Sequence, residues 1–398
     1  MRYLFFTGCL FFLIICSCVD SSRRLQVFLP VSDREKEFLE TNIFSAFTEK
    51  YACSVNLVTD YRVDLKKKTV TAANDDQCRL DLLAADIMQV QGLTRDRIIA
   101  PVKELAAFKV PFYPALQQKA GADNGLSFVF FRPRLQLLYY HKKKLQGSGV
   151  KPLPDWAAFL KKARLWSREK GPNRVMIKGP GKEDHLWQLC EYIIQAGGDP
   201  FVFNDQGCKQ AFAFFRKLWP HLVHPPEQDR NDNRLQLFRE GRIYLMQVSS
   251  VCYSQLAQET GSVAVGCSPR GPANAAHLIG GEVLAIPAAS TKKKLTLQFI
   301  RFMLSRDIQS ALAQKLKWLP VRQDLVWFNK TSLGKAVKQS MQNGIWPRPE
   351  WAEEQFRRLF QEAFARIVTE HEPPALLVQF QSRMRKITDR NKKSAAPK

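Results

Sequence analysis

Apolar positions follow two different periods along the first 90 residues. Residues 25–29 are almost entirely apolar and predict a strand, whereas residues 35–51 carry apolar side chains at helical spacing. Two more strands are predicted at 55–58 and 80–85, with a helix at 65–73 between them. Strands that alternate with helices predict an α/β fold with a parallel sheet and right-handed crossovers.

The same two patterns continue through the rest of the chain, which contains no internal repeat. Residues 128–140 are rich in aromatic residues and leucine and predict a long β stretch. Asp155 is placed to cap the helix that follows it. The remaining expected helices are 156–169, 185–195, 209–218, 294–304, 308–316, 351–369 and 376–387, and the remaining strands are 243–248 and 283–287.

The N-terminus has the pattern of an export signal. Residues 4–15 form an apolar run that is too short to span a membrane comfortably but fits the central region of a signal peptide. The Ile-Cys-Ser-Cys sequence that ends at Cys18 resembles a bacterial lipobox, which predicts a lipoprotein signal peptide at 1–17 and acylation of Cys18. An ordinary cleaved signal peptide and an N-terminal anchor helix are the alternatives. Each of the three places the protein outside the cytoplasm, and the lipobox predicts a lipid anchor in the bacterial membrane.

Composition indicates a folded, two-lobed protein. Hydrophobic residues make up 45% and charged residues 24% of the chain, values that are ordinary for globular proteins. The chain exceeds the roughly 250–300 residues at which a single core stops growing, so two lobes are expected. The formal charge of +23 is spread along the sequence without a nucleic-acid-binding motif. We therefore expect a solvated basic surface and no nucleic-acid partner.

The cysteines outside the leader are even in number. In an oxidising compartment they permit disulfides, and free buried thiols are the alternative for each. The sequence lacks a C-x-x-C motif, so neither a redox site, a metal site nor another cofactor is expected. The loop with His221, His224 and Glu227 lacks the spacing of a zinc motif. The candidate pairs, taken from sequence neighbours, are Cys53–Cys78, Cys190–Cys208 and Cys252–Cys267.

The order of these elements resembles the family 1 extracellular solute-binding proteins, the maltose-binding-protein-like receptors of ABC sugar importers. Residues 138–142 are similar to the family's L-Y-Y-N-K strand, and residues 238–246 to its F-x-x-G-K-x-A-M segment. Five further segments are similar to family motifs: F-E-K-Y-x-x-x-V at 47–55, P-x-T-W at 154–156, G-G-x-x-L-A-I-P at 280–287, F-I-x-F-L-x-S-x-x-x-Q at 299–309 and L-P-x-R at 319–322. They follow one another in the same order as in the family.

The resemblance implies the type II periplasmic-binding-protein fold, in which two α/β lobes close about a hinge. It also implies a monomeric receptor, not an enzyme, that delivers a carbohydrate-type ligand to an ABC permease. A tethered sensor or adhesion lipoprotein is the alternative, and an extracytoplasmic hydrolase is a third. The expected segments are 18–130 and 280–318 for the N-lobe, 131–279 and 319–390 for the C-lobe, and 391–398 for a basic disordered tail.

Four charged residues are candidates for the ligand site. Asp86 directly follows the third predicted strand, where ligands of α/β sheets bind, and it matches an acidic residue of the family; its alternative role is a helix N-cap. Arg132 and Arg134 lie on the expected inter-lobe strand, and their planar guanidiniums would suit a carboxylate or phosphate. A plain surface strand is the alternative. Glu282 follows two glycines at a position that often faces ligand in the family.

Tryptophans are the candidates for stacking on a sugar ring. Trp187, Trp318, Trp346 and Trp351 could each serve, and each could instead belong to the core. Residues 249–253 lack the tryptophan that the family often has there. This difference and the two arginines leave both a neutral sugar or polyol and an acidic or phosphorylated derivative open.

Overall fold

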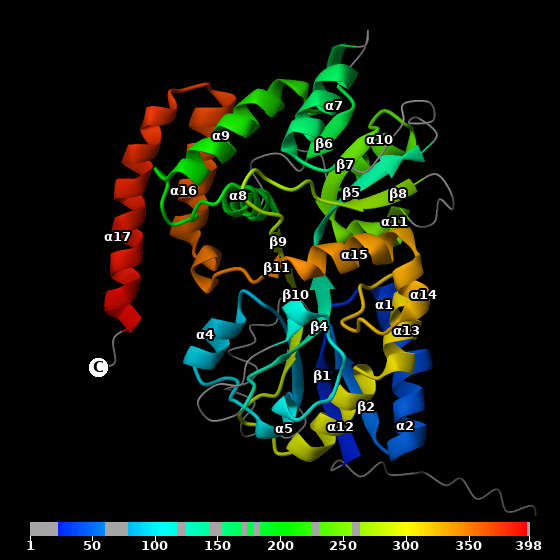
Figure 1. Cartoon of the computed structure of the whole chain (residues 1–398). Helices are drawn as coiled ribbons and strands as arrows, with labels where there is room; N and C mark the ends of the chain where they lie inside the picture. Colours follow the sequence, from blue (N-terminus) through cyan, green and yellow to red (C-terminus); the bar gives the residue numbers. More distant parts are fainter. Residues whose placement is uncertain are drawn as a thin grey trace, which may run out of the picture.

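The first lobe is built on a five-stranded sheet with the order β2-β1-β3-β10-β4 (Figure 1). Strands β1 (Arg24–Phe28), β2 (Ser54–Val58) and β3 (Leu82–Asp86) pair in parallel, as the alternating pattern predicts. β10 (Gly280–Ala285) is antiparallel to both β3 and β4 (Val129–Arg134). The computed structural model describes residues 23–59, 79–117, 125–142, 153–168, 173–177, 184–224, 231–256 and 263–395.

A nearly continuous helix follows β1 and corresponds to the helix predicted at 35–51. A capping box between Ser32 and Glu35 starts it, because each side chain accepts a hydrogen bond from the other residue's backbone N–H. It consists of α1 (Asp33–Phe38), a π-helical segment (Leu39–Phe44) and α2 (Ser45–Tyr51). The helix predicted at 65–73 lies outside the described residues. The other helices on this lobe are α4 (Val90–Arg95), α5 (Lys103–Ala106), α12 (Lys293–Met303), α13 (Arg306–Lys315) and α14 (Val326–Lys330).

The second lobe has a four-stranded sheet with the order β6-β7-β5-β8. β5 (Gln136–His141) is antiparallel to β7 (Leu245–Ser249) and to β8 (Val263–Cys267), whereas β6 (Val175–Ile177) is parallel to β7. Aromatic side chains fill the space between this sheet and its helices, including Phe159, Tyr192, Phe212 and Phe360, each at most 1% exposed. The helices are α7 (Trp156–Arg168), α8 (Asp184–Gln195), α9 (Gln206–Leu218), α10 (Asn231–Arg239), α11 (Tyr253–Leu256), α16 (Glu354–Phe364) and α17 (Leu377–Ala395).

Two chain crossings between the lobes lie side by side. The β stretch predicted at 128–140 divides at Leu135, because β4 belongs to the first sheet and β5 to the second. The predicted boundary after residue 130 therefore falls inside β4. The chain returns through β9 (His277–Leu278) directly into β10. β9 pairs in parallel with β11 (Gly344–Ile345), which follows α15 (Ser332–Gln342) between the lobes (Figure 1).

The C-terminal helix differs from the expectation. α17 continues to Ala395, so residues 391–395, which were predicted to be disordered, are helical. Leu377, Phe380 and Met384 of this helix are buried in the second lobe, at the spacing of one helical face, and this packing holds the helix against the lobe. Within the described ranges, no helix combines the length and the hydropathy needed to cross a membrane.

The predicted disulfides are not formed in this structure. Cys53, Cys190, Cys208 and Cys267 are free thiols, which rules out each expected pair there, and Cys78 and the predicted lipidation site Cys18 lie outside the described residues. The Cys208 Sγ donates to the carbonyl oxygen of Val202 at 2.9 Å. Burial raises the pKa of both the Cys190 and the Cys208 thiol, so both are protonated at neutral pH. Proximity in sequence does not determine where a thiol points, and the Cys208 thiol points to the carbonyl oxygen of Val202.

Candidate functional site

A cavity of about 560 Å³ lies between the lobes, and both lobes and the crossing strands contribute to its walls. The first lobe supplies the residues that directly follow β3, and the crossings supply the residues around Leu135 and Leu278. The second lobe supplies two tryptophans, a serine and an arginine. The lining residues are Asp86, Met88, Gln89, Arg134, Leu135, Gln136, Leu186, Trp187, Ser249, Leu278, Gly280, Trp351 and Arg357.

Asp86 is the last residue of β3 and lines the cavity, as its position at the carboxyl end of the strand predicts. Its Oδ1 accepts the backbone N–H of Met88 at 3.0 Å, and its backbone carbonyl accepts the N–H of Gln89 at 2.8 Å. α4 starts only at Val90, with Gln89 as the N-cap residue and without a side-chain cap. The carboxylate therefore closes a turn at the cavity wall and does not cap α4.

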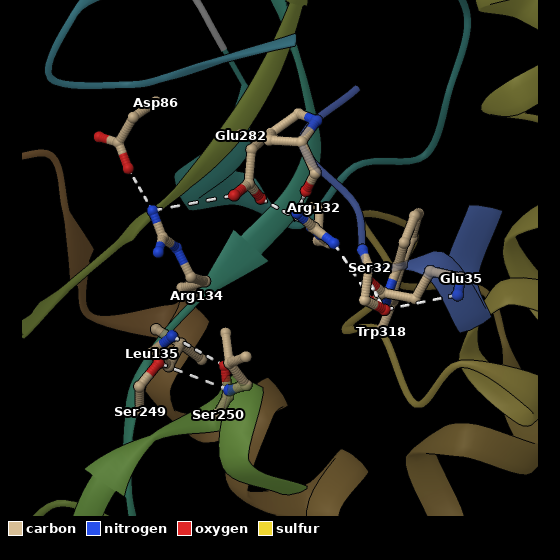
Figure 2. Close-up of polar contacts among 12 residues, drawn as sticks. Ser32, Glu35, Asp86, Arg132, Arg134, Leu135, Ser249, Ser250, Glu282 and Trp318 are labelled. Carbon is tan, nitrogen blue, oxygen red and sulfur yellow. Dashed lines mark hydrogen bonds and ion pairs between the residues drawn. The ribbon is translucent and has the colours of Figure 1, made fainter. Parts of the chain in front are cut away.

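Arg134 carries the positive charge next to Asp86 (Figure 2). Its Nη2 contacts Asp86 Oδ2 in a short ion pair and lies 3.9 Å from Glu282 Oε1. Glu282 lies on the neighbouring strand β10, where it is opposite both Asp86 and Arg132 in the register. One buried carboxylate thus lies between two guanidiniums that project from alternate residues of β4.

The pKa values of Asp86 and Glu282 are shifted in opposite directions. Burial raises the pKa of Asp86, and the Arg134 guanidinium offsets only part of that effect. Burial also works against ionisation of Glu282, but Arg132 and Arg134 together outweigh it and hold the Glu282 pKa below its usual value. Glu282 is therefore the fixed negative charge of the cluster, and Asp86 is the carboxylate that takes up a proton more readily.

Trp187 and Trp351 form the aromatic wall on the second lobe. Trp187 projects from α8, and Trp351 lies in a short 3-10 turn before α16. Their ring centroids are 6.2 Å apart with the planes almost perpendicular, and Trp351 also stacks on Phe356 at 6.2 Å. Trp351 is 2% exposed, whereas Trp187 is only partly buried. Trp187 is consequently the tryptophan with more surface available to a ligand.

Four of the predicted contacts do not line this cavity. Arg132 points away from this cavity, and its guanidinium lies 4.5 Å from the ring centroid of Trp318. The Trp318 indole donates to Glu35 at 2.6 Å, so this ring stabilises an ion-pair cluster. Trp346 donates to the carbonyl oxygen of Ala115 at 2.6 Å and packs edge-on against Phe130. Glu282 also lies outside the lining and reaches the cavity only through Arg134.

Several polar residues of the wall were not predicted from the sequence. Gln136 and Ser249 are paired residues at the ends of β5 and β7, and nothing in their local pattern marks them as unusual. Arg357 lies on α16, six residues after Trp351, and pairs with Glu354 at 2.6 Å. Only the family's glycine pair pointed to Gly280. The signal that could have identified Gln136 is its place directly after a lobe crossing.

The loop with the two histidines does not form a metal site in the described residues. His221 Nδ1 is 2.7 Å from Ser167 Oγ, and His224 Nε2 is 2.9 Å from the carbonyl oxygen of Trp219. Glu227 lies outside the described residues. Across the ranges that the structure describes, three or more His, Cys, Asp or Glu side chains nowhere gather as metal ligands would.

Known structures share this architecture. MalE from Xanthomonas citri, a sugar-binding protein, superimposes with a TM-score of 0.78 over 94% of this chain and 100% of its own, at 17% identity. The GacH receptor of Streptomyces glaucescens, solved unliganded and with acarbose, gives 0.74 over 92% and 98%, at 16% identity. UgpB from Mycobacterium tuberculosis, solved with glycerophosphocholine, gives 0.72 over 92% and 99%, at 17% identity.

These similarities establish the two-lobed fold, as the sequence predicts. The family model described as bacterial extracellular solute-binding protein matches residues 42–336, which is more than half of the chain. The matched region includes both crossings and the charged cluster around Glu282. The chain belongs to the bacterial extracellular solute-binding proteins.

Proposed function

We propose that this protein binds a neutral, hydroxyl-rich ligand, a sugar or a polyol, in the cavity between its lobes and delivers it to an ABC permease. A ligand that touches both walls favours the closed arrangement of the lobes, and the closed form is the one that a permease would recognise. The protein itself catalyses no reaction in this scheme. A lipid on Cys18 would hold it at the membrane outside the cytoplasm.

The observation that carries the proposal is the contrast between the walls of the cavity. The tryptophans of the second lobe offer an apolar face for a sugar ring, and Asp86 and Arg134 offer an acceptor and donors for hydroxyl groups. Two wall atoms, Trp351 Nε1 and Gln136 Oε1, are buried without a hydrogen-bond partner among the described residues. A ligand hydroxyl that reached either atom would remove the cost of leaving it unpaired.

The charges of the wall favour a neutral ligand over an anionic one. Arg134 is paired with Asp86, and Arg132 is paired with Glu282 outside the cavity. Arg357 is likewise paired, with Glu354. A phosphate would have to break one of these pairs and leave a carboxylate beside its own negative charge. We therefore expect phosphorylated ligands to bind more weakly than their neutral counterparts.

Thermal unfolding of the purified protein tests this proposal. The panel consists of neutral compounds with matched phosphates: glucose with glucose 6-phosphate, sorbitol with sorbitol 6-phosphate, and maltose and ribitol without one. A compound at about 100 times its Kd stabilises a protein by roughly 2.7 kcal/mol, which is visible as a higher midpoint. Trp187→Ala serves as the matched control, because it removes the ring from the wall and should abolish the shift.

A shift with a neutral compound and a smaller one with its phosphate would support the proposal. The reverse order would overturn the neutral preference. No shift with any member of the panel, or with glycerophosphocholine tested beside it, would favour a tethered sensor or an adhesion protein over a sugar receptor.

A further inference from the structure

Arg132 is held by several groups of the first lobe (Figure 2). Its Nη2 donates to the carbonyl oxygen of Pro30 at 2.9 Å, and its Nη1 lies 3.5 Å from Glu35 Oε1. The guanidinium also lies over the ring of Trp318, and its side chain is only 15% exposed. Such a fixed guanidinium cannot follow a ligand in the cavity, so its role must be exerted through its neighbours.

Glu282 is the neighbour that transmits this role. Its side chain is 10% exposed, and Arg132 Nε donates to Glu282 Oε2 at 2.8 Å. The second cation, Arg134, is farther away, at 3.9 Å from Oε1. A buried carboxylate requires a close cation, because an uncompensated buried charge is strongly destabilising. Arg132 meets this requirement.

Arg134 could meet the same requirement, and it would then leave the cavity wall. Arg132 and Arg134 are two residues apart on β4 and so project to the same face, towards Glu282. Arg134 instead makes its close contact with Asp86. Gly281 allows β10 to approach β4 closely, so that both arginines can reach Glu282. Its φ is +115°, and a Cβ there would lie 2.2 Å from the carbonyl oxygen of Arg132.

We propose that Arg132 is a positioning residue for the binding site: by neutralising Glu282 from outside the cavity, it leaves Arg134 to pair with Asp86 at the cavity wall. The relevance to ligand rests on the proposed function, but the arrangement of the charges does not. Loss of Arg132 would draw Arg134 towards Glu282 and leave Asp86 without its cation.

The Asp86 carboxyl reports this rearrangement without any ligand. We would label the aspartate side-chain carboxyls of the full-length protein with ¹³C, assign Asp86 with the Asp86→Asn variant, and titrate by NMR. In Arg132→Gln the pKa of Asp86 should rise by on the order of one unit, the effect of losing an opposite charge at contact distance. Arg132→Lys retains a cation for Glu282 and should restore most of the wild-type value.

Arg322 provides a matched control: it forms a β-bridge with Phe112 of the first lobe, although residues 319–390 were expected in the C-lobe. Its side chain is 13% exposed, it pairs with Asp324 at 2.7 Å, and it donates to the carbonyl oxygen of Leu304 at 3.1 Å. Arg322→Gln therefore removes a guanidinium of similar burial and bonding that is absent from the cavity lining. We expect it to leave the Asp86 pKa unchanged, which separates positioning from a general loss of stability.

An unchanged Asp86 pKa in folded Arg132→Gln would overturn the proposal, because Glu282 would then take up a proton and leave Arg134 in place. An equal rise in Arg322→Gln would overturn it as well. If Arg132→Gln does not fold, Arg132→Lys decides. Its single ammonium cannot reproduce all the guanidinium contacts, so we expect a small rise in the Asp86 pKa. The absence of any rise would contradict the proposal. Failure of every sugar to bind would leave these outcomes intact and would count only against the proposed function.

Discussion

The first-lobe wall of the cavity differs from the second-lobe wall in its chemistry and in the groups that support it. On the first lobe, Asp86 and Arg134 are charged, about one third exposed and part of an ion-pair cluster that extends through β10. On the second lobe, Trp187 and Trp351 are apolar and rest on the aromatic core around Phe356. The first wall is suited to fix the orientation of hydroxyl groups, and the second to contribute contact area.

Substitution of Trp351 should mainly lower stability, whereas substitution of Trp187 should mainly weaken ligand binding. Trp351→Ala leaves a cavity beside Phe356 in the second-lobe core and should lower the free energy of unfolding by about 3–5 kcal/mol. Trp187→Ala removes a partly exposed ring and should cost much less, while weakening ligand binding. Urea unfolding of both variants checks this, and equal losses would show that the two rings do not differ in role.

Glu282→Gln tests the buried part of the first wall. Removing this carboxylate leaves Arg132 with an incomplete set of acceptors, and we expect a loss of about 3 kcal/mol at pH 7. Because the folded-state pKa of Glu282 is depressed, its stabilisation is present above its unfolded pKa of about 4.3 and is lost as the pH falls further. The stability difference between wild type and variant should therefore narrow below that pH, and a constant difference would contradict the assignment.

Gly281→Ala tests the close approach of β10 to β4. An alanine would need a φ of +115°, and its Cβ would collide with the carbonyl oxygen of Arg132. We expect a loss of about 2 kcal/mol, as for a strained backbone position. Gly92→Ala is the control, because a Cβ there meets no atom within 4 Å. Chemical denaturation compares the two, and a similar effect at both positions would argue against a tight crossing.

Asp86→Asn should have the smallest effect, with the opposite sign. The raised folded-state pKa means that the stability contributed by Asp86 is present below its unfolded pKa of about 3.9 and is lost as the pH rises through the folded value. The variant should thus be more stable than wild type at pH 7, by less than about 1 kcal/mol, and the gain should disappear at low pH. A large loss at pH 7 would mean that the pair with Arg134 outweighs burial.

The periodic parts of the sequence predicted the fold well. The parallel pairing of β1, β2 and β3 was predicted from the alternation of strands and helices. The position of Asp86 at the cavity was predicted from the rule that ligands bind at the carboxyl ends of such strands. The two wall tryptophans were among the candidates, although nothing local distinguished them from Trp318 and Trp346. Residue type and spacing are enough where one chain segment determines the structure.

The remaining features depend on contacts between distant segments. Arg132 was expected at the ligand because it lies with Arg134 on the inter-lobe strand, but Trp318 and Glu35 come from other parts of the chain and hold it away from the cavity. The expected Cys190–Cys208 pair failed for a similar reason, since the Cys208 thiol is directed to the carbonyl of Val202. A single sequence does not contain these orientations.

Small-angle X-ray scattering tests most directly whether the two lobes close on the ligand. The radius of gyration would be measured for the ligand-free protein and for the protein saturated with the neutral compound that stabilises it most. If the ligand joins the charged wall to the aromatic wall, the radius of gyration should fall on binding, and it should fall less in Trp187→Ala at the same compound concentration. A compound that binds and stabilises without changing the radius of gyration would contradict closure of the lobes on the ligand.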